Sequence, residues 1–245
     1  MKVKRWINQW GSLIIVVVIW ELVSFFGLVP KFLLPSFTHV LTVLFQEGNI
    51  LAMHVLTTLV EALIGLSFSV FLAGILAVLM DKYHCVHTFM MPLLLVSQTI
   101  PTVALAPLLI LWFGYGMMPK IILIVIVCFF PLTMSLLNGF KQIDEAYLNM
   151  MNSFHASYWQ IMKYVKFPFA LPSFFSGLKV STSYAIISAV IAEWLGGDSG
   201  LGVYMTRVRK SYAFDKMFAV IILISLFSLI LLWGVNRIER FVLQK

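Results

Sequence analysis

Charged residues are scarce in this chain, which has 245 residues, 11% of them charged and 61% hydrophobic. A soluble domain carries about 25% charged and about 45–50% apolar residues, so a soluble enzyme, a disordered chain and a coiled coil are excluded. Cysteine is scarce too. Cys85 and Cys128 are the only two, and neither their number nor their spacing suggests a disulfide framework or a metal site.

Motifs for nucleotide chemistry are absent. The sequence has neither a phosphate loop of the form GxxxxGK followed by Ser or Thr nor a dinucleotide fingerprint. The five histidines lie outside the hydrophobic centres, which disfavours a membrane enzyme with a convergent acid–base site. The net charge is +7, and the charged residues lie between the apolar runs. We therefore expect cytoplasmic loops rather than a nucleic-acid surface.

Six apolar stretches are long enough to cross a bilayer, whose core needs about 20 apolar residues in a helix. The predicted spans are 12–29, 55–80, 89–113, 121–137, 171–195 and 217–235. The sequence therefore predicts an all-α membrane protein whose single transmembrane domain covers residues 1–245. Small residues recur along 55–80 and 171–195, and small residues let membrane helices approach closely, so we expect these two spans to form the core of the bundle.

Basic residues at the span ends indicate the orientation. Lys2, Lys4 and Arg5 precede the first span, so the N-terminus is expected in the cytoplasm. Alternation places ten of the 17 Lys and Arg inside and six outside, Lys120 among the latter, with Lys179 inside a span. Both termini are then cytoplasmic, in a multi-pass protein of the cytoplasmic (inner) membrane. The first apolar stretch is longer than a signal-peptide core, so it is interpreted as a retained helix.

Two segments between the spans have unusual compositions. Segment 31–53 begins with Pro35-Ser36 and carries apolar residues at helical spacing, which predicts a short amphipathic helix at the membrane interface. Segment 140–168 is too polar to span and, at about 28 residues, is far longer than most connections. It is rich in Met and aromatic residues, which are favoured in contact surfaces, so we expect it to dock a partner.

The docking segment contains two runs with a recognisable pattern, Ala156-Ser157-Tyr158-Trp159 and Phe167-Pro168-Phe169-Ala170-Leu171-Pro172. They resemble the cytoplasmic loop of ABC importer permeases, in the branch that imports sulfonates, nitrate and thiamine precursors. Two departures from the family pattern stand out: Asn149-Met150 replaces Glu-Ala, and His155 replaces Gly. Runs elsewhere resemble the same branch, and those at 98–101 and 194–205 are most similar to permeases for thiamine precursors such as hydroxymethylpyrimidine.

The resemblance implies a MetI-like permease fold with cytoplasmic coupling helices and a pathway for a small molecule delivered by a substrate-binding protein. It implies two ATP-hydrolysing subunits and a second permease chain, most simply a homodimer. This chain would bind no cofactor, because ATP and Mg²⁺ belong to the partner ATPase. Sulfonate or taurine, nitrate and riboflavin remain alternative substrates. A non-transport membrane scaffold and a secondary transporter are alternatives of other classes.

The coupling site is expected to be a helix around 144–154, a turn near His155 and a second helix around 157–164, ended by Pro168 and Pro172. Its residues are Asn149, Met150, Met151, Phe154, His155, Ala156, Ser157, Tyr158, Trp159 and Pro168. A Gly at the turn would permit positive φ. With His155 there, either the turn is built differently, or the partner groove compensates, or His155 is simply an exposed turn residue.

Polar groups and prolines at membrane depth suggest a translocation pathway at Gln98, Thr99, Pro101 and Glu193. The alternative for Gln98 is a hydrogen bond between helices. The alternative for Glu193 is a bond to the Gly196-Gly197 loop or to the partner chain. Glu21 and Glu61 are interpreted as structural. Four aromatic residues could line a path for a planar heterocycle or could simply pack: Trp112, Tyr115, Phe129 and Phe130.

Overall fold

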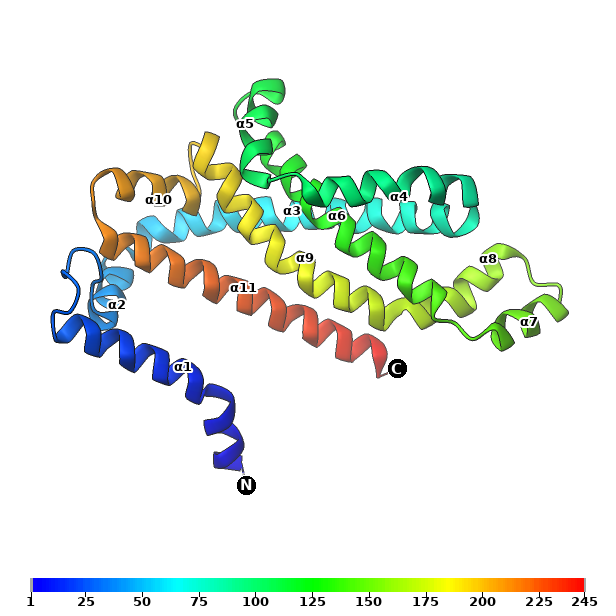
Figure 1. The fold of residues 1–245 in the computed structure, drawn as a ribbon, viewed down its shortest axis with the longest axis horizontal. Helices are drawn as coiled ribbons and strands as arrows, with labels where there is room; N and C mark the ends of the chain where they lie inside the picture. Colours follow the sequence, from blue (N-terminus) through cyan, green and yellow to red (C-terminus); the bar gives the residue numbers. More distant parts are fainter. Residues whose placement is uncertain (1, 245) are drawn as a thin grey trace.

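The computed structural model describes the backbone of residues 2–244 and the side chains of residues 11–244. Within this range every regular element is helical, as the sequence predicts (Figure 1). The elements are α1 (Lys2–Phe25), α2 (Phe37–Gln46), α3 (Gly48–Lys82), α4 (His84–Thr99), α5 (Thr102–Phe113), α6 (Met117–Lys141), α7 (Glu145–Ser153), α8 (Tyr158–Ile161), the π-helical turn η1 (Met162–Lys166), α9 (Phe167–Gly196), α10 (Leu201–Lys210) and α11 (Phe214–Leu243).

The core of the bundle is formed by three helices, α3, α6 and α9. Glycines permit their close approach: a Cβ on Gly65 of α3 would lie 2.6 Å from Ile124 of α6, and one on Gly139 of α6 would lie 2.8 Å from Ala170 of α9. The expected core of α3 and α9 is therefore incomplete. Helix α6 packs along both of them, because its own small and apolar face fills the space between.

Four helices of the described chain are long and apolar enough to cross a membrane: α3, α6, the helix Tyr158–Gly196 and α11. Helices α4 and α5 pass the same test together, but they are bent by 104° at their junction. The predicted span 89–113 is thus not straight, because Ile100 and Pro101 adopt extended conformations there. The described residues therefore give up to five candidate spans, where six were expected.

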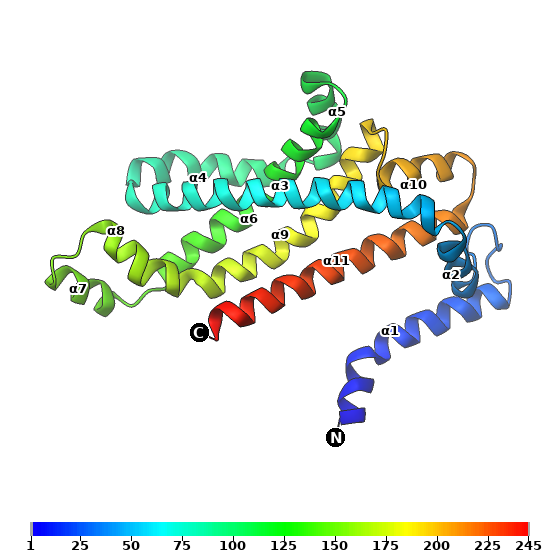
Figure 2. The ribbon, with the colours of Figure 1, turned by 180° about the vertical axis from the view of Figure 1, so that it is seen from behind.

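The first predicted span, 12–29, ends before its predicted boundary. Helix α1 ends at Phe25, and Gly27 then turns the chain with φ +66°. Figures 1 and 2 both show α1 leaning away from the bundle, with α2 beside its C-terminal end. The Trp20 indole N–H donates to the Pro35 carbonyl at 2.8 Å, which holds the connection in place.

The short amphipathic helix predicted after Pro35-Ser36 is present as α2. The Ser36 hydroxyl caps it by accepting a hydrogen bond from the His39 N–H at 3.3 Å. Val40 and Val43 form its buried face and pack against α11. This helix brings the chain back to the start of α3 at the end of the bundle that also holds α10.

The basic residues near 207–216 lie mainly on a helix. Arg207, Arg209 and Lys210 occupy the last turn of α10, where the partial negative charge of the helix end favours cations. Lys216 forms an ion pair with Glu47, which also accepts a hydrogen bond from the Tyr204 hydroxyl at 3.3 Å. These contacts join α10 and α11 to the junction of α2 and α3.

Candidate coupling site and translocation pathway

The predicted coupling segment projects from one end of the bundle as α7, α8 and the turn between them (Figure 1). Its first helix begins at Asp144, whose carboxylate accepts from the Ala146 N–H at 2.9 Å. Its second helix begins at Ser157, where a capping box pairs Ser157 with Gln160 in both directions. Both helices therefore begin where the sequence predicts, and each has its own local cap.

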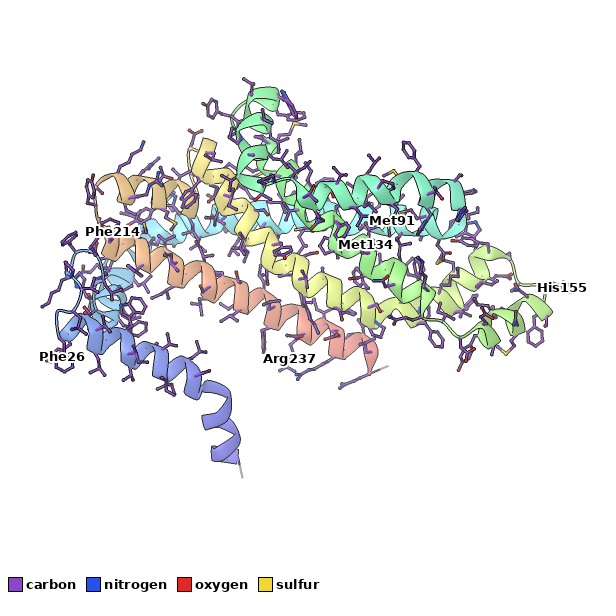
Figure 3. All side chains as sticks on the ribbon, viewed as in Figure 1. Phe26, Met91, Met134, His155, Phe214 and Arg237 are labelled. Carbon is purple, nitrogen blue, oxygen red and sulfur yellow. The ribbon has the colours of Figure 1, made fainter. Side chains whose placement is uncertain are left out.

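The turn between the two helices has His155 in the left-handed conformation, with φ +54°. The His155 N–H donates to the Asn152 carbonyl at 2.9 Å, and the Ala156 N–H donates to the Met151 carbonyl at 3.0 Å. These two bonds form a Schellman motif, in which Gly is the usual residue at this position. Figure 3 shows His155 at the far end of the segment. Of the alternatives for this residue, a differently built turn is wrong.

Several large apolar side chains on the segment are exposed. Phe154 is 77% exposed, Trp159 is 59% exposed and Met150 is 49% exposed, and α7 buries none of its residues. Met151, Ala156 and Tyr158 are half-buried, and the remaining predicted coupling residues are exposed: Asn149, His155, Ser157 and Pro168. The segment thus presents a rigid, capped, apolar knob.

The base of the knob is tied to the end of α3 by a polar contact that the sequence pattern does not predict. The Tyr158 hydroxyl donates to Asp81 at 2.9 Å, and the Lys166 ammonium donates to both Asp81 carboxylate oxygens at 2.7 Å. Lys82 lies 5.1 Å from the ring centre of Trp159 and 5.4 Å from that of Tyr158. Asp81 was missed because its partners are about 80 residues away in sequence; its only local signal is an acidic side chain at the end of an apolar span.

The second half of the knob continues into the core without a break, because α8, η1 and α9 form one helix over Tyr158–Gly196. Pro168 and Pro172 stand where the coupling segment is expected to end, but they do not break this helix. In η1 the Phe167 N–H donates to the Met162 carbonyl, five residues earlier, so the register changes just before Pro168. Pro168 then lies in the first turn of the new α-helical register, where its missing N–H costs nothing.

Three of the four predicted pathway residues, Gln98, Thr99 and Pro101, meet at the sharp bend between α4 and α5. All three are exposed in the single chain, and the Thr99 hydroxyl donates to the Val96 carbonyl at 2.8 Å. Irregular backbone at membrane depth is tolerated where protein covers it or where it lines a water-filled cavity. Gln98, Thr99 and Pro101 thus lie together at a bend whose irregular backbone is exposed in the single chain.

Glu193 lies apart from the bend, in a buried polar cluster. Its carboxylate accepts from the Thr58 hydroxyl and from the Gly202 N–H, both at 2.7 Å. Thr58 accepts in turn from the Leu201 N–H at 2.9 Å. Gly200, with φ +118°, leaves no room for a Cβ beside the Glu193 carboxylate. Glu193 therefore binds the first turn of α10, not the Gly196-Gly197 loop.

A buried ion pair lies close to this cluster. Lys120 of α6 pairs with Glu61 of α3, and the two side chains are 5% and 2% exposed. The sequence places Lys120 just outside a predicted span, whereas the structure places it in the first turn of α6, buried in the bundle. Lys179 pairs with Glu239 of α11 at 2.6 Å. No group of three or more His, Cys, Asp or Glu among the described residues could hold a metal ion.

Comparison with known proteins gives the family. A family model described as the inner membrane component of binding-protein-dependent transport systems matches residues 66–244. A probable ABC transporter permease protein of Haemophilus influenzae is 34% identical over 229 residues, which cover 93% of this chain and 94% of the relative. The formylaminopyrimidine transport permease protein ThiX of Halalkalibacterium halodurans is 32% identical over 231 residues, covering 94% and 92%.

The fold is similar to that of a solved bacterial ABC transporter involved in the import of the acidic polysaccharide alginate. The match has a TM-score of 0.68 at 16% identity and covers 98% of this chain and 99% of the other. The expected MetI-like architecture is thereby confirmed. The chain belongs to the family of inner membrane components of binding-protein-dependent transport systems and is a permease subunit of an ABC importer.

Proposed function

We propose that the coupling segment, residues 144–168, docks on a partner ATPase and transmits its movement to the membrane helices. The observation that carries this proposal is the exposed apolar knob around Phe154 and Trp159, which runs on without a break into α9. Apolar side chains exposed at the tip of a rigid, capped structure fit a groove in another protein.

Two routes lead from the knob into the bundle. The continuous helix Tyr158–Gly196 carries any tilt of α8 directly into the core. The contacts of Tyr158 and Lys166 with Asp81 carry the same movement to α3. Since α3 and α9 both pack on α6, the three core helices move as one rigid body, and two states of the ATPase select two orientations of this body.

The proposal also specifies the partner proteins. Two ATP-hydrolysing subunits use ATP and Mg²⁺, two copies of this permease form the pathway, and a substrate-binding protein delivers the substrate. We place both termini in the cytoplasm. Lys2, Lys4 and Arg5 precede the first helix, and Arg237, near the end of α11, lies toward the end of the bundle from which the coupling segment projects (Figure 3). The chain itself contributes no cofactor site.

The pathway runs along the bend at Gln98, Thr99 and Pro101, which the second permease copy covers. Glu193 acts on it indirectly, by holding α10 against α3 and α9. The substrate is a planar nitrogen heterocycle, a thiamine precursor related to hydroxymethylpyrimidine. This choice is supported by the 32% identity to the formylaminopyrimidine permease and by Trp112 and Tyr115 near the end of α5, which are 65% and 78% exposed.

Permeases for other substrates are also similar to this chain, and those substrates are the alternatives. A riboflavin permease protein, RibX of Chloroflexus aurantiacus, is 29% identical, and a taurine permease protein, TauC of Escherichia coli, is 28% identical. Binding measurements on the substrate-binding protein that works with this permease decide among them. Tight binding of a pyrimidine supports the proposal, whereas binding of taurine, another sulfonate, nitrate or riboflavin alone replaces it.

The coupling proposal is tested by ATP-driven uptake in vesicles that contain all the subunits. Trp159→Ala, which removes an apolar contact, and His155→Trp, which enlarges the turn, are both expected to lower uptake at unchanged protein abundance. Phe45→Ala is the matched control, because Phe45 is 86% exposed on α2, away from the segment. Equal uptake by Trp159→Ala and the control at normal abundance would remove the coupling role.

A further inference from the structure

A cavity of about 360 Å³ lies beside the coupling segment, between the end of α3, the start of α4 and the end of α6. Met80 and Leu137 form its apolar floor, and its polar lining is Asp81, Lys82, His84, His87 and Lys141. The permease role described above assigns no ligand to it. Two lysines and two histidines outnumber the single acid in this lining.

The one acid in the lining is already neutralised. Asp81 accepts two hydrogen bonds from the Lys166 ammonium, so its charge is balanced from outside the cavity. The imidazoles of His84 and His87 are stacked, with ring centres 6.3 Å apart, and the buried His87 Nε2 has no hydrogen-bond partner among the described residues. Lys82 and Lys141 thus give the cavity a net positive charge, and His87 Nε2 adds an unpaired polar atom to its lining.

The backbone adds to this charge. Helix α4 begins at His84 on the cavity wall, and its N-cap residue, Tyr83, makes no side-chain capping bond. The first turn of a helix carries partial positive charge and N–H groups without intrahelical partners, which favours an anion. The N-terminus of α4 and the two lysines therefore point to the same kind of ligand, a phosphate group.

The surroundings indicate which phosphate. The cavity lies at the turn between two apolar helices, where the candidate span α3 ends. Tyr83 and Phe89 on the adjoining surface are 45% and 71% exposed. Basic pockets between membrane helices are suited to the headgroups of anionic lipids. We propose that this cavity binds the phosphate of an anionic phospholipid, whose acyl chains lie along α4.

Lys82 links this lipid to coupling, because the same ammonium lies over the rings of Tyr158 and Trp159. A lipid phosphate held at Lys82 fixes the position of this side chain and thereby steadies the base of the knob. This second step rests on the proposed coupling function, whereas lipid binding at the cavity does not.

Binding is measured by native mass spectrometry of the purified permease with added phosphatidylglycerol, phosphatidylcholine as the neutral lipid, and inorganic phosphate as the free anion. The double variant Lys82→Gln, Lys141→Gln is expected to retain phosphatidylglycerol about 30-fold more weakly, from the loss of two cations. Lys82→Arg, Lys141→Arg keeps the charge and should keep the lipid. The matched control Arg237→Gln, Arg240→Gln loses equal charge outside the cavity and should bind like the original.

Equal retention of phosphatidylglycerol by the Gln double variant and the original protein overturns the proposal, as does equal binding of phosphatidylcholine. Displacement of phosphatidylglycerol by inorganic phosphate at similar concentration also overturns it, in favour of a free-anion site. Since mass spectrometry needs no transport, these outcomes stand apart from any failure of coupling. In vesicles, uptake per ATP should rise with phosphatidylglycerol for the original and not for Lys82→Gln; an equal response contradicts the link through Lys82.

Discussion

The Lys166 ammonium donates to both carboxylate oxygens of Asp81 at 2.7 Å, across 85 residues of sequence. The two side chains are 16% and 12% exposed, so the pair is largely shielded from water. It joins the helix that leaves the coupling knob to the end of α3. All three core helices are therefore attached to the knob: α6 and α9 through the backbone, and α3 through this ion pair.

Asp81→Asn should uncouple the two helices. We expect the unfolding free energy to fall by about 1–3 kcal/mol, because Lys166 keeps its charge and loses its partner. Uptake per ATP hydrolysed should fall more than abundance does. The exchange Asp81→Lys with Lys166→Asp restores the pair in reverse and should recover part of the uptake. An Asp81→Asn protein that transports normally per ATP would show that α3 is not driven through this contact.

His155→Gly should stabilise the coupling turn. A non-glycine residue in the left-handed conformation costs about 1–2 kcal/mol, and glycine removes this cost at φ +54°. His155→Val should destabilise it, since β-branched residues tolerate positive φ least. Limited proteolysis of the segment checks both, and the order of resistance should be Gly, then His, then Val. Resistance highest for Val would contradict the turn described for this residue.

Lys120→Met should be among the most damaging single changes in the bundle. It leaves the Glu61 carboxylate buried without a cation, a loss typically worth about 3–5 kcal/mol. Adding Glu61→Leu removes the uncompensated charge and should recover much of the thermal stability. Protein yield and melting temperature in detergent measure both effects. A single Lys120→Met variant as stable as the original would mean that the two residues do not form a buried pair.

Glu47 should make the stability depend on pH at the acidic end. The hydrogen bond from Lys216 holds the Glu47 pKa below its ordinary value of 4.5. Its stabilisation is therefore fully present above about pH 4.5 and is lost as the pH falls through the lowered value in the folded state. Glu47→Gln should melt lower than the original at pH 6, with the gap closing below about pH 4. The same gap for Glu47→Gln at both pH values would exclude this role.

The coupling turn could be predicted from sequence because its determinants are local. Asp144, Ser157 and Gln160 are capping residues at the correct spacing, and α7 and α8 begin where those residues indicate. The amphipathic helix α2 after Ser36 was predictable for the same reason. Local capping and periodicity act within one or two turns, and that is the range in which the residue pattern determines the structure.

The rest depends on contacts that no local pattern records. From the sequence alone Lys120 is interpreted as a loop charge. In the structure α6 packs on α3, and Lys120 pairs with Glu61, 59 residues away in sequence. Pro168 suggests a helix break, because the residue pattern does not reveal the π-helical turn that precedes it in the structure. The opposite holds at Pro101, where the apolar run 89–113 suggests one straight span but the backbone bends by 104°. In each case tertiary packing overrides a sound local rule.

The central claim is that the knob contacts the partner ATPase, and site-specific photocrosslinking tests it most directly. A photoreactive amino acid replaces Phe154, 77% exposed at the turn, or the control Phe45, 86% exposed on α2. In the assembled transporter, the probe at 154 should crosslink to the ATP-hydrolysing subunit and the probe at 45 should not. Absence of this crosslink at 154 in a complex that still hydrolyses ATP and imports substrate would contradict the account.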